Sequence, residues 1–221
     1  MRPTSPALAV LFLLFLAPNS QVNCLWPIPR QLHTGSTALQ LSENFKFTVN
    51  IKNPPKDLSA AVQRFTYDLT NDKHQRLVVG RDAANRDIIR QAPAMSTVAL
   101  FLQDGSPARP IAEVTSHSMD AWSEGYSMVI PADGSPGSIT ANSTLGLYRG
   151  LTTFAQLWYD LEGTVYSIEA PIQISDNPAF VCPCMFTLQP ADARSLAISG
   201  LYARYRQEFV GIVKFHMTTA T

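Results

Sequence analysis

Cysteine is scarce in this chain of 221 residues, which contains only Cys24, Cys182 and Cys184. A single proline separates the last two, and a disulfide that closes so small a ring would be strained. Pairing with a partner chain, or free thiols, are therefore the better expectations for them. The sequence excludes a small scaffold held together by disulfides, so its stability must come from a packed core.

An excess of charge of either sign is also absent. The chain has 17 Lys and Arg against 17 Asp and Glu, and its pI is about 6.9. Balanced charge produces no long-range field that would attract a polyanion. We therefore expect no nucleic-acid partner. The hydrophobic fraction of 46% is that of an ordinary globular protein and excludes wholesale disorder.

No apolar run reaches the roughly 20 residues that span a bilayer. The run from Ala7 to Ala17 follows the positive charge of Arg2 and precedes small residues suited to cleavage, a pattern typical of a secretory signal peptide. We expect residues 1–24 to be this leader, with cleavage after Cys24 favoured over cleavage after Ser20. The mature chain is then expected outside the cell or in the lumen of the secretory pathway, with no membrane partner.

The motifs that anchor common enzyme classes are missing as well. Neither G-x-S-x-G nor a phosphate-binding glycine pattern occurs, which sets aside serine hydrolases and nucleotide-dependent enzymes and predicts no cofactor. Asp160 and Glu162 lie in turn-like sequence, where a solvated surface is expected rather than a catalytic pair. No H-E-x-x-H pattern exists, so no protein-held metal is predicted from the scattered histidines, which are His33, His74, His117 and His216.

Hydrophobic periodicity predicts strands and helices in alternation. Phe45 to Ile51 alternates with a period of two, as a strand does, and Leu58 to Leu69 repeats as a helix, with Asp57 placed to cap it. The order of elements predicts helices on one face of a mixed sheet, in an α/β or α+β layer. Further strands are expected at Leu77–Val79, Thr97–Leu102, Tyr126–Ile130, Ser138–Ala141, Val165–Ile168 and Ile172–Ile174, the third and fourth forming a hairpin.

The clearest helix follows this hairpin. Its apolar stripe repeats at spacings of four, three and four residues, and Asn142 or Ser143 is expected to cap it. Asn142-Ser143-Thr144 is also the one N-glycosylation sequon, so Asn142 is a candidate acceptor in an exported protein. A capping role for Asn142 would shield it from the transferase. The stripe consists of Leu147, Leu151, Phe154 and Trp158.

Three more side chains allow two interpretations each. Arg149 is either a surface arginine or one half of a buried structural ion pair. Trp26 and Trp122 could stack on sugar rings, but tryptophan is more often packed, so packing is expected for both.

Three ordered segments carry a family resemblance. They are Leu25 to Arg30 (LWPIPR), Ile139 to Leu157 (ITANSTLGLYRGLTTFAQL) and Ala170 to Phe180 (APIQISDNPAF). Together they resemble eukaryotic, fungal-type secreted β-N-acetylhexosaminidases of glycoside hydrolase family 20. The resemblance covers Leu25 to Phe180. It implies the family's non-catalytic N-terminal domain, an α+β fold called zincin-like, with a mostly antiparallel sheet, helices on one face and no zinc.

The resemblance stops after Phe180. In the family an Arg-Gly pair would open a TIM barrel there, and a later Asp-Glu pair would act in catalysis, but residues 181–221 match none of these. No catalytic residue can therefore be assigned, and the substrate-binding residues stay unknown. The tail also has an excess of positive charge, whereas residues 25–180 have an excess of negative charge. We hypothesise a frameshift or splice product; alternatively, Leu201 to Val213 forms an amphipathic helix that covers the sheet or a partner.

Two functional hypotheses follow. In the first, the chain carries the accessory domain of an enzyme that hydrolyses terminal non-reducing N-acetylhexosamine residues, with N-acetylhexosamine-containing glycans as the implied ligands, and is inactive alone. In the second, the same domain is a non-catalytic module that binds a glycan or associates with a full-length hexosaminidase as a subunit. Hydrolysis of an aryl N-acetylglucosaminide discriminates between them.

Overall fold

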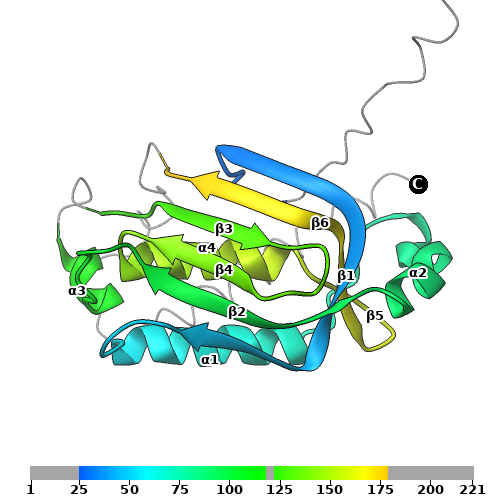
Figure 1. The fold of residues 1–221 in the computed structure, drawn as a ribbon, viewed down its shortest axis with the longest axis horizontal. Helices are drawn as coiled ribbons and strands as arrows, with labels where there is room; N and C mark the ends of the chain where they lie inside the picture. Colours follow the sequence, from blue (N-terminus) through cyan, green and yellow to red (C-terminus); the bar gives the residue numbers. More distant parts are fainter. Residues whose placement is uncertain (1–24, 118–121, 179–221) are drawn as a thin grey trace, which may run out of the picture.

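The computed structural model describes residues 25–117 and 122–178. The signal peptide predicted at residues 1–24, the tail 181–221 and the helix predicted at Leu201 to Val213 lie outside the described residues. Figure 1 shows the elements along the chain. They are β1 (Gln31–Val49), α1 (Lys56–Asn71), the 3₁₀ segment η3 (Val79–Asn85), α2 (Arg86–Arg90), β2 (Ala94–Leu102), α3 (Ile111–Ser116), β3 (Tyr126–Ile130), β4 (Gly137–Ala141), α4 (Thr144–Gln156), β5 (Tyr159–Leu161) and β6 (Thr164–Asp176).

The six strands form one sheet in the order β1-β2-β4-β3-β6-β5. Two pairings are parallel, β1 with β2 and β2 with β4, and the other four are antiparallel. Strand β1 is long enough to pair twice, with β6 along Gln31 to Gln40 and with β2 along Gln40 to Val49. In Figure 1 it runs across the molecule and joins the two sides of the sheet. The expected α+β fold with a mostly antiparallel sheet is confirmed.

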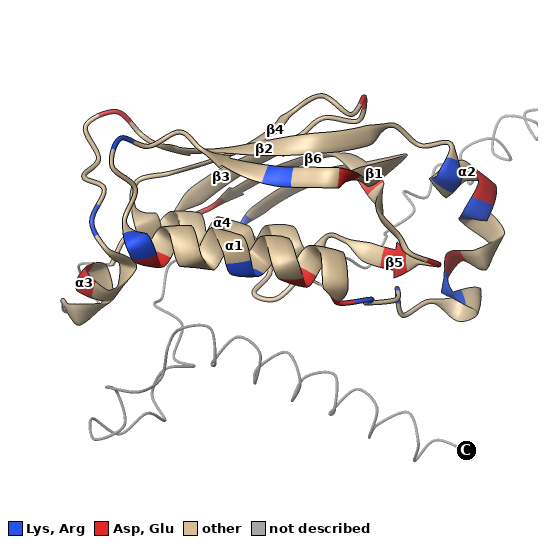
Figure 2. Cartoon of the chain, turned by 90° about the horizontal axis from the view of Figure 1, so that it is seen from below, with Lys and Arg blue, Asp and Glu red and all other residues tan. Residues whose placement is uncertain are grey.

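Helices α1 and α4 cover one face of the sheet, as expected (Figure 2). The core lies between them and the sheet because every second strand residue faces the helices. Phe154 of α4 lies at its centre, in ring contact with Phe45 and Phe47 of β1. Among the described residues no helix is long and apolar enough to cross a membrane. Side chains with no exposed surface include Leu39, Leu58, Leu100, Ile130, Ile139, Leu147, Leu151 and Ile172.

Helix α1 is confirmed, and its predicted apolar residues Leu58, Val62, Phe65 and Leu69 are all buried. The predicted cap is wrong, because Pro55 occupies the N-cap position and no side chain caps the helix there. Asp57 lies inside the first turn instead. Its carboxylate accepts hydrogen bonds from the backbone N–H of Leu58 at 2.8 Å and of Ala112 at 3.1 Å, which ties α1 to α3.

Helix α4 is capped by Ser143, whose hydroxyl accepts a hydrogen bond from the N–H of Gly146 at 3.0 Å. Of the two predicted caps, Ser143 is therefore confirmed and Asn142 is wrong. Two glycines let this helix approach the sheet closely. A Cβ on Gly150 would lie 2.6 Å from Cγ2 of Ile139 in β4, and one on Gly146 would overlap the carbonyl oxygen of Gly125.

The strand predicted at Leu77 to Val79 is wrong. This stretch is exposed and runs into η3, where Gly80, Arg81 and Asp82 adopt positive φ, a conformation that a strand does not have. Three apolar residues in a row were too short a signal to indicate a buried strand.

The two strands predicted at Val165 to Ile168 and Ile172 to Ile174 form one continuous strand, β6. Pro171 does not interrupt it, because the pairing with β1 shifts register opposite this residue, between Thr34 and Thr37, and needs no N–H there. Strand β1 likewise begins at Gln31, well before the predicted Phe45, since its first half lacks a clean alternation.

Candidate functional site

Buried carboxylates are the first candidates for chemistry in this domain. Among the described residues, six are at most 8% exposed, which is rare for acidic side chains unless each has a partner. Their partners therefore decide whether any is available to a substrate. The six are Asp68, Asp82, Glu124, Asp160, Glu169 and Asp176.

Asp82 is the centre of the most elaborate cluster. The hydroxyl of Tyr166 donates to its Oδ2 at 2.7 Å, and Nδ2 of Asn85 donates to its Oδ1 at 3.2 Å. The guanidinium of Arg76 lies 3.4 Å from both carboxylate oxygens and 6.0 Å from the ring centroid of Tyr159. The carboxylate of Asp82 is thus engaged on both oxygens within the protein.

The charge of Arg76 also acts on Glu169 of β6. Burial raises the pKa of Glu169, and the nearby charge of Arg76 opposes that rise. Burial, followed by the hydrogen bond to Asp82, raises the pKa of Tyr166 far above its usual value. Tyr166 therefore stays protonated at physiological pH and acts as a hydrogen-bond donor, not as a base. The arrangement holds η3 against β6 and offers no free nucleophile.

Glu124 and Arg149 form a second buried pair. Nη2 of Arg149 lies 2.8 Å from Oε1 of Glu124, and the two side chains are 26% and 5% exposed. Of the two interpretations of Arg149, the structural ion pair is confirmed. Beside it, the hydroxyls of Tyr126 and Thr153 lie 2.6 Å apart, and burial raises the pKa of Tyr126 to about 12. These contacts join α4 to β3 and to the segment before it.

Asp160 and Glu162 occupy different environments. The expectation of a solvated surface is wrong for Asp160, which is 8% exposed and accepts a hydrogen bond from the N–H of Gly163 at 3.3 Å. The short β5–β6 turn buries it. Glu162 is exposed as expected and forms ion pairs with Arg86 and Arg90 of α2. The two side chains do not act as a pair.

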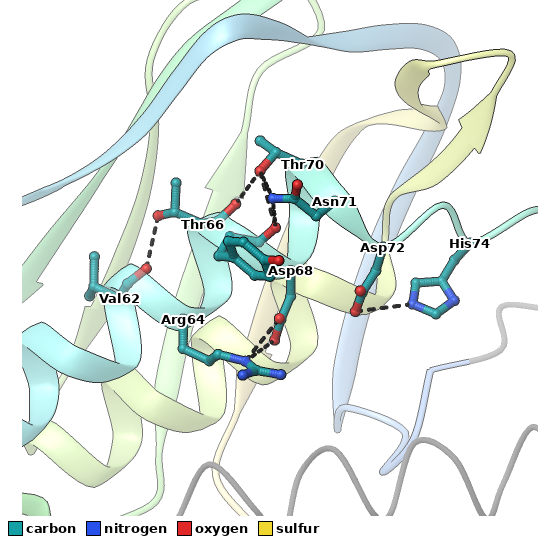
Figure 3. Close-up of polar contacts among 9 residues, drawn as sticks. Val62, Arg64, Thr66, Asp68, Thr70, Asn71, Asp72 and His74 are labelled. Carbon is teal, nitrogen blue, oxygen red and sulfur yellow. Dashed lines mark hydrogen bonds and ion pairs between the residues drawn. The ribbon is translucent and has the colours of Figure 1, made fainter.

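Helix α1 and the loop after it carry the next candidates (Figure 3). Nε of Arg64 lies 2.9 Å from Oδ1 of Asp68, and Nε2 of His74 lies 3.6 Å from Oδ2 of Asp72. Thr66 and Thr70 hydrogen-bond to carbonyls of their own helix. A His–Asp contact alone makes neither a metal site nor a catalytic relay. Among the described residues no three His, Cys, Asp or Glu side chains gather as metal ligands.

The predicted aromatic residues have different surroundings. Trp122 is partly buried against the core and donates from Nε1 to the carbonyl of His117 at 3.1 Å, so packing is confirmed for it. Packing is wrong for Trp26, which is 53% exposed, next to Ile28 at 70%. The Trp26 backbone is held by the Gln156 side chain at the end of α4, through hydrogen bonds of 2.8 and 2.9 Å. The protein therefore presents an apolar side chain on an anchored segment.

Asn142 lies in the turn between β4 and α4 with its side chain exposed. It borders a cavity of about 200 Å³ at the α3 end of the molecule, whose described lining contains Arg109 and His117 but no carboxylate. An acid pair for glycoside hydrolysis is thus not part of this lining.

The sequence of this chain identifies its family. The family described as "beta-acetyl hexosaminidase like" matches residues 25–157, which is more than half of the chain. The chain therefore belongs to this family. A comparison with curated proteins finds no match.

The chain is also similar to parts of several solved structures. The chitobiase of Flavobacterium johnsoniae is 21% identical with a TM-score of 0.46, and the alignment covers 72% of this chain and 21% of that one. The family 20 β-N-acetylhexosaminidase of Streptomyces coelicolor A3(2) is 15% identical with a TM-score of 0.42, covering 73% and 28%. The family 20 exo-β-N-acetylglucosaminidase of Vibrio harveyi is 13% identical with a TM-score of 0.39, covering 70% and 19%. The chain spans less than a third of the length of each.

The sequence alone did not indicate the Asp82 cluster. Arg76, Asp82, Tyr166 and Glu169 are far apart in the chain and follow no motif. The one local signal was the dipeptide Gly80-Arg81 before Asp82, which is compatible with a turn but does not say what the turn contacts.

Proposed function

We propose that this chain supplies the non-catalytic N-terminal domain of a secreted, fungal-type β-N-acetylhexosaminidase of glycoside hydrolase family 20. The family membership of residues 25–157 is the observation that carries the proposal. The burial of Asp82 and Glu124 against Tyr166 and Arg149 of the same domain supports a non-catalytic role, because both carboxylates are turned toward the protein interior and not toward a substrate.

The enzyme to which the domain belongs would remove terminal non-reducing N-acetylhexosamine residues from glycans and chitin oligomers. In this proposal the domain contributes stability and positioning, and the reaction takes place elsewhere. The domain boundaries are proposed as 1–24 for the leader, 25–180 for the domain and 181–221 for a divergent tail.

Turnover by the chain itself tests the proposal. The full chain is expressed through a secretory host, purified and incubated with 4-nitrophenyl N-acetylglucosaminide and the corresponding galactosaminide, beside an active hexosaminidase. We expect release of nitrophenol no faster than in buffer. Saturable turnover that copurifies with the chain would overturn the non-catalytic assignment.

The exposed Trp26 favours a second candidate, a glycan-binding or subunit-binding role for the same domain. Solvent-exposed tryptophan stacks readily on sugar rings and is enriched in protein interfaces. Titration calorimetry with N,N′-diacetylchitobiose compares the wild type with Trp26→Ala and with Tyr67→Ala. Tyr67 is a matched control because it is a similarly exposed aromatic residue, at 59%, on α1. Binding lost only in Trp26→Ala supports this role, and no binding by the wild type contradicts a glycan ligand.

A further inference from the structure

In the folded domain, the first residue of the sequon at 142–144 is accessible to solvent and the third is not. Asn142 is exposed, and Ser143 rather than Asn142 caps α4, so the Asn142 amide is not engaged as the helix cap. Among the described residues, none forms a hydrogen bond with this amide. The capping role that would have shielded Asn142 is thus performed by its neighbour.

Thr144, the third residue of the sequon, is the inaccessible one. It has no exposed surface, and its hydroxyl donates to the carbonyl oxygen of Arg109 at 2.7 Å. Ser143 is fixed at the same place, since its hydroxyl donates to the carbonyl of Ser123 while accepting from Gly146. A transferase that reads the hydroxyl of the third sequon residue cannot reach it once α4 has packed.

We propose that Asn142 carries an N-linked glycan and that the glycan is added before the β4–α4 turn folds. Nδ2 of Asn142 attacks the anomeric carbon of an oligosaccharide linked to a lipid diphosphate. The N–C bond forms, the bond from the anomeric carbon to the phosphate oxygen breaks, the lipid diphosphate leaves, and Nδ2 loses one proton to a base. The finished glycan projects from the α3 end of the domain without disturbing the Thr144 hydrogen bond.

This inference depends on entry into the secretory pathway and not on the hexosaminidase role, so the two can fail separately. The full chain is translated in the presence of microsomes, protected from added protease by translocation, and analysed by gel mobility before and after an endoglycosidase. We expect one glycosidase-sensitive shift in the wild type and none in Asn142→Gln. Because the chain has a single sequon, a shift that persists in Asn142→Gln overturns the assignment. So does a protected wild-type chain without a shift, or a wild-type chain that fails to enter the microsomes.

Matched variants separate the effect of the sequon on glycosylation from the effect of the helix cap. Ser143→Ala removes the cap but preserves the sequon, and Thr144→Ser preserves both the sequon and a hydroxyl. We expect both variants to be glycosylated. Loss of the shift in Ser143→Ala would mean that the helix end, and not the sequon, governs modification, and would contradict the proposal.

The order of events is tested with purified oligosaccharyltransferase and its lipid-linked donor. The acceptors are the folded, unmodified full chain from a bacterial cytosol and a synthetic peptide of residues 138–149. We expect the peptide to be modified and the folded chain to be modified at least tenfold more slowly. Equal rates for the two acceptors would overturn the requirement for modification before folding.

Discussion

Arg76 is a cation that pairs with the buried carboxylate of Asp82 and acts electrostatically on that of Glu169. Its side chain is 17% exposed and that of Asp82 only 5%, so solvent screens the pair weakly. Taking charges out of water is costly, and Arg76 compensates this cost for Asp82 directly and for Glu169 through its field. The cluster thus makes the position of η3 depend on one guanidinium group.

Replacing Arg76 by Ala is expected to destabilise the domain by about 3–5 kcal/mol, because it leaves an uncompensated buried charge. Urea unfolding followed by circular dichroism measures the change. Arg90→Ala is the matched control, since its side chain is 61% exposed and its pair with Glu162 should contribute about 0–1 kcal/mol. Equal costs for the two variants would contradict a special role for Arg76.

Glu169 makes stability depend on pH. Burial raises its pKa in the folded state, so folding favours the protonated form. The stability associated with this protonated form is complete below the pKa of the unfolded state, about 4.3, and is lost as the pH rises through the raised folded value. Glu169→Gln removes this titration. We expect the variant to gain stability relative to the wild type between acidic and neutral pH, as measured by urea midpoints over that range.

A difference between Glu169→Gln and wild type that stays constant over pH would show that Glu169 does not titrate there. Glu162→Gln is the control, because Glu162 is half exposed and no comparable relative gain is expected toward neutral pH.

At the level of elements, the approach of α4 to the sheet depends on Gly150. Alanine is the better helix former by about 1 kcal/mol, and an exposed glycine in a helix would be improved by it. Here the added Cβ would meet Ile139, so Gly150→Ala is expected to cost about 1–3 kcal/mol through overpacking.

Thermal unfolding of Gly150→Ala, Ile139→Ala and the double variant measures this contact. Truncating Ile139 removes the atom that the new methyl group meets, so the double variant should be less destabilised than the two single changes combined. Strict additivity would show that the two residues do not compete for the same space.

The elements differ in how well the sequence predicts them. Helices α1 and α4, the hairpin of β3 and β4, and the buried half of β1 each have one face covered, so their apolar residues follow a clear period. The first half of β1, the short strand β5 and the segment η3 depend on contacts with distant residues instead. Gln31 pairs with Ser175, and Asp82 meets Tyr166, and no local pattern records such partners.

The residues of the candidate site also fall into those that local sequence predicts and those that depend on distant contacts. Ser143 could be predicted as a cap and Asn142 as a glycan acceptor, because both depend on neighbouring residues in the chain. A buried ion pair at Arg149 was one of two open alternatives, but its partner Glu124 and the burial of Asp160 were not predicted. Both depend on how α4 and β6 pack, which local sequence does not specify.

At the scale of the whole molecule, the double pairing of β1 determines how the strands of the sheet are connected. One strand pairs with β6 and with β2, and β3 and β4 complete the connection between those two, so the pairings form a closed circuit. Contacts of this kind join residues far apart in sequence, and they predict slow, cooperative folding in which no part of the sheet is stable alone.

Leu39 tests this cooperativity. It has no exposed surface and lies in β1 opposite Ser167 of β6, next to Gln40, where pairing with β2 begins. Leu39→Ala is expected to destabilise the domain by about 2–5 kcal/mol. If the circuit unfolds as one unit, amide hydrogen exchange must accelerate by the same factor in β2 and in β6.

Phe101→Ala, at a position 37% exposed in β2, is the control and should leave exchange in β6 nearly unchanged. Faster exchange confined to β6 in Leu39→Ala would mean that the two halves of β1 belong to separate cooperative units, because loss of the β6 pairing would then leave the β2 pairing intact.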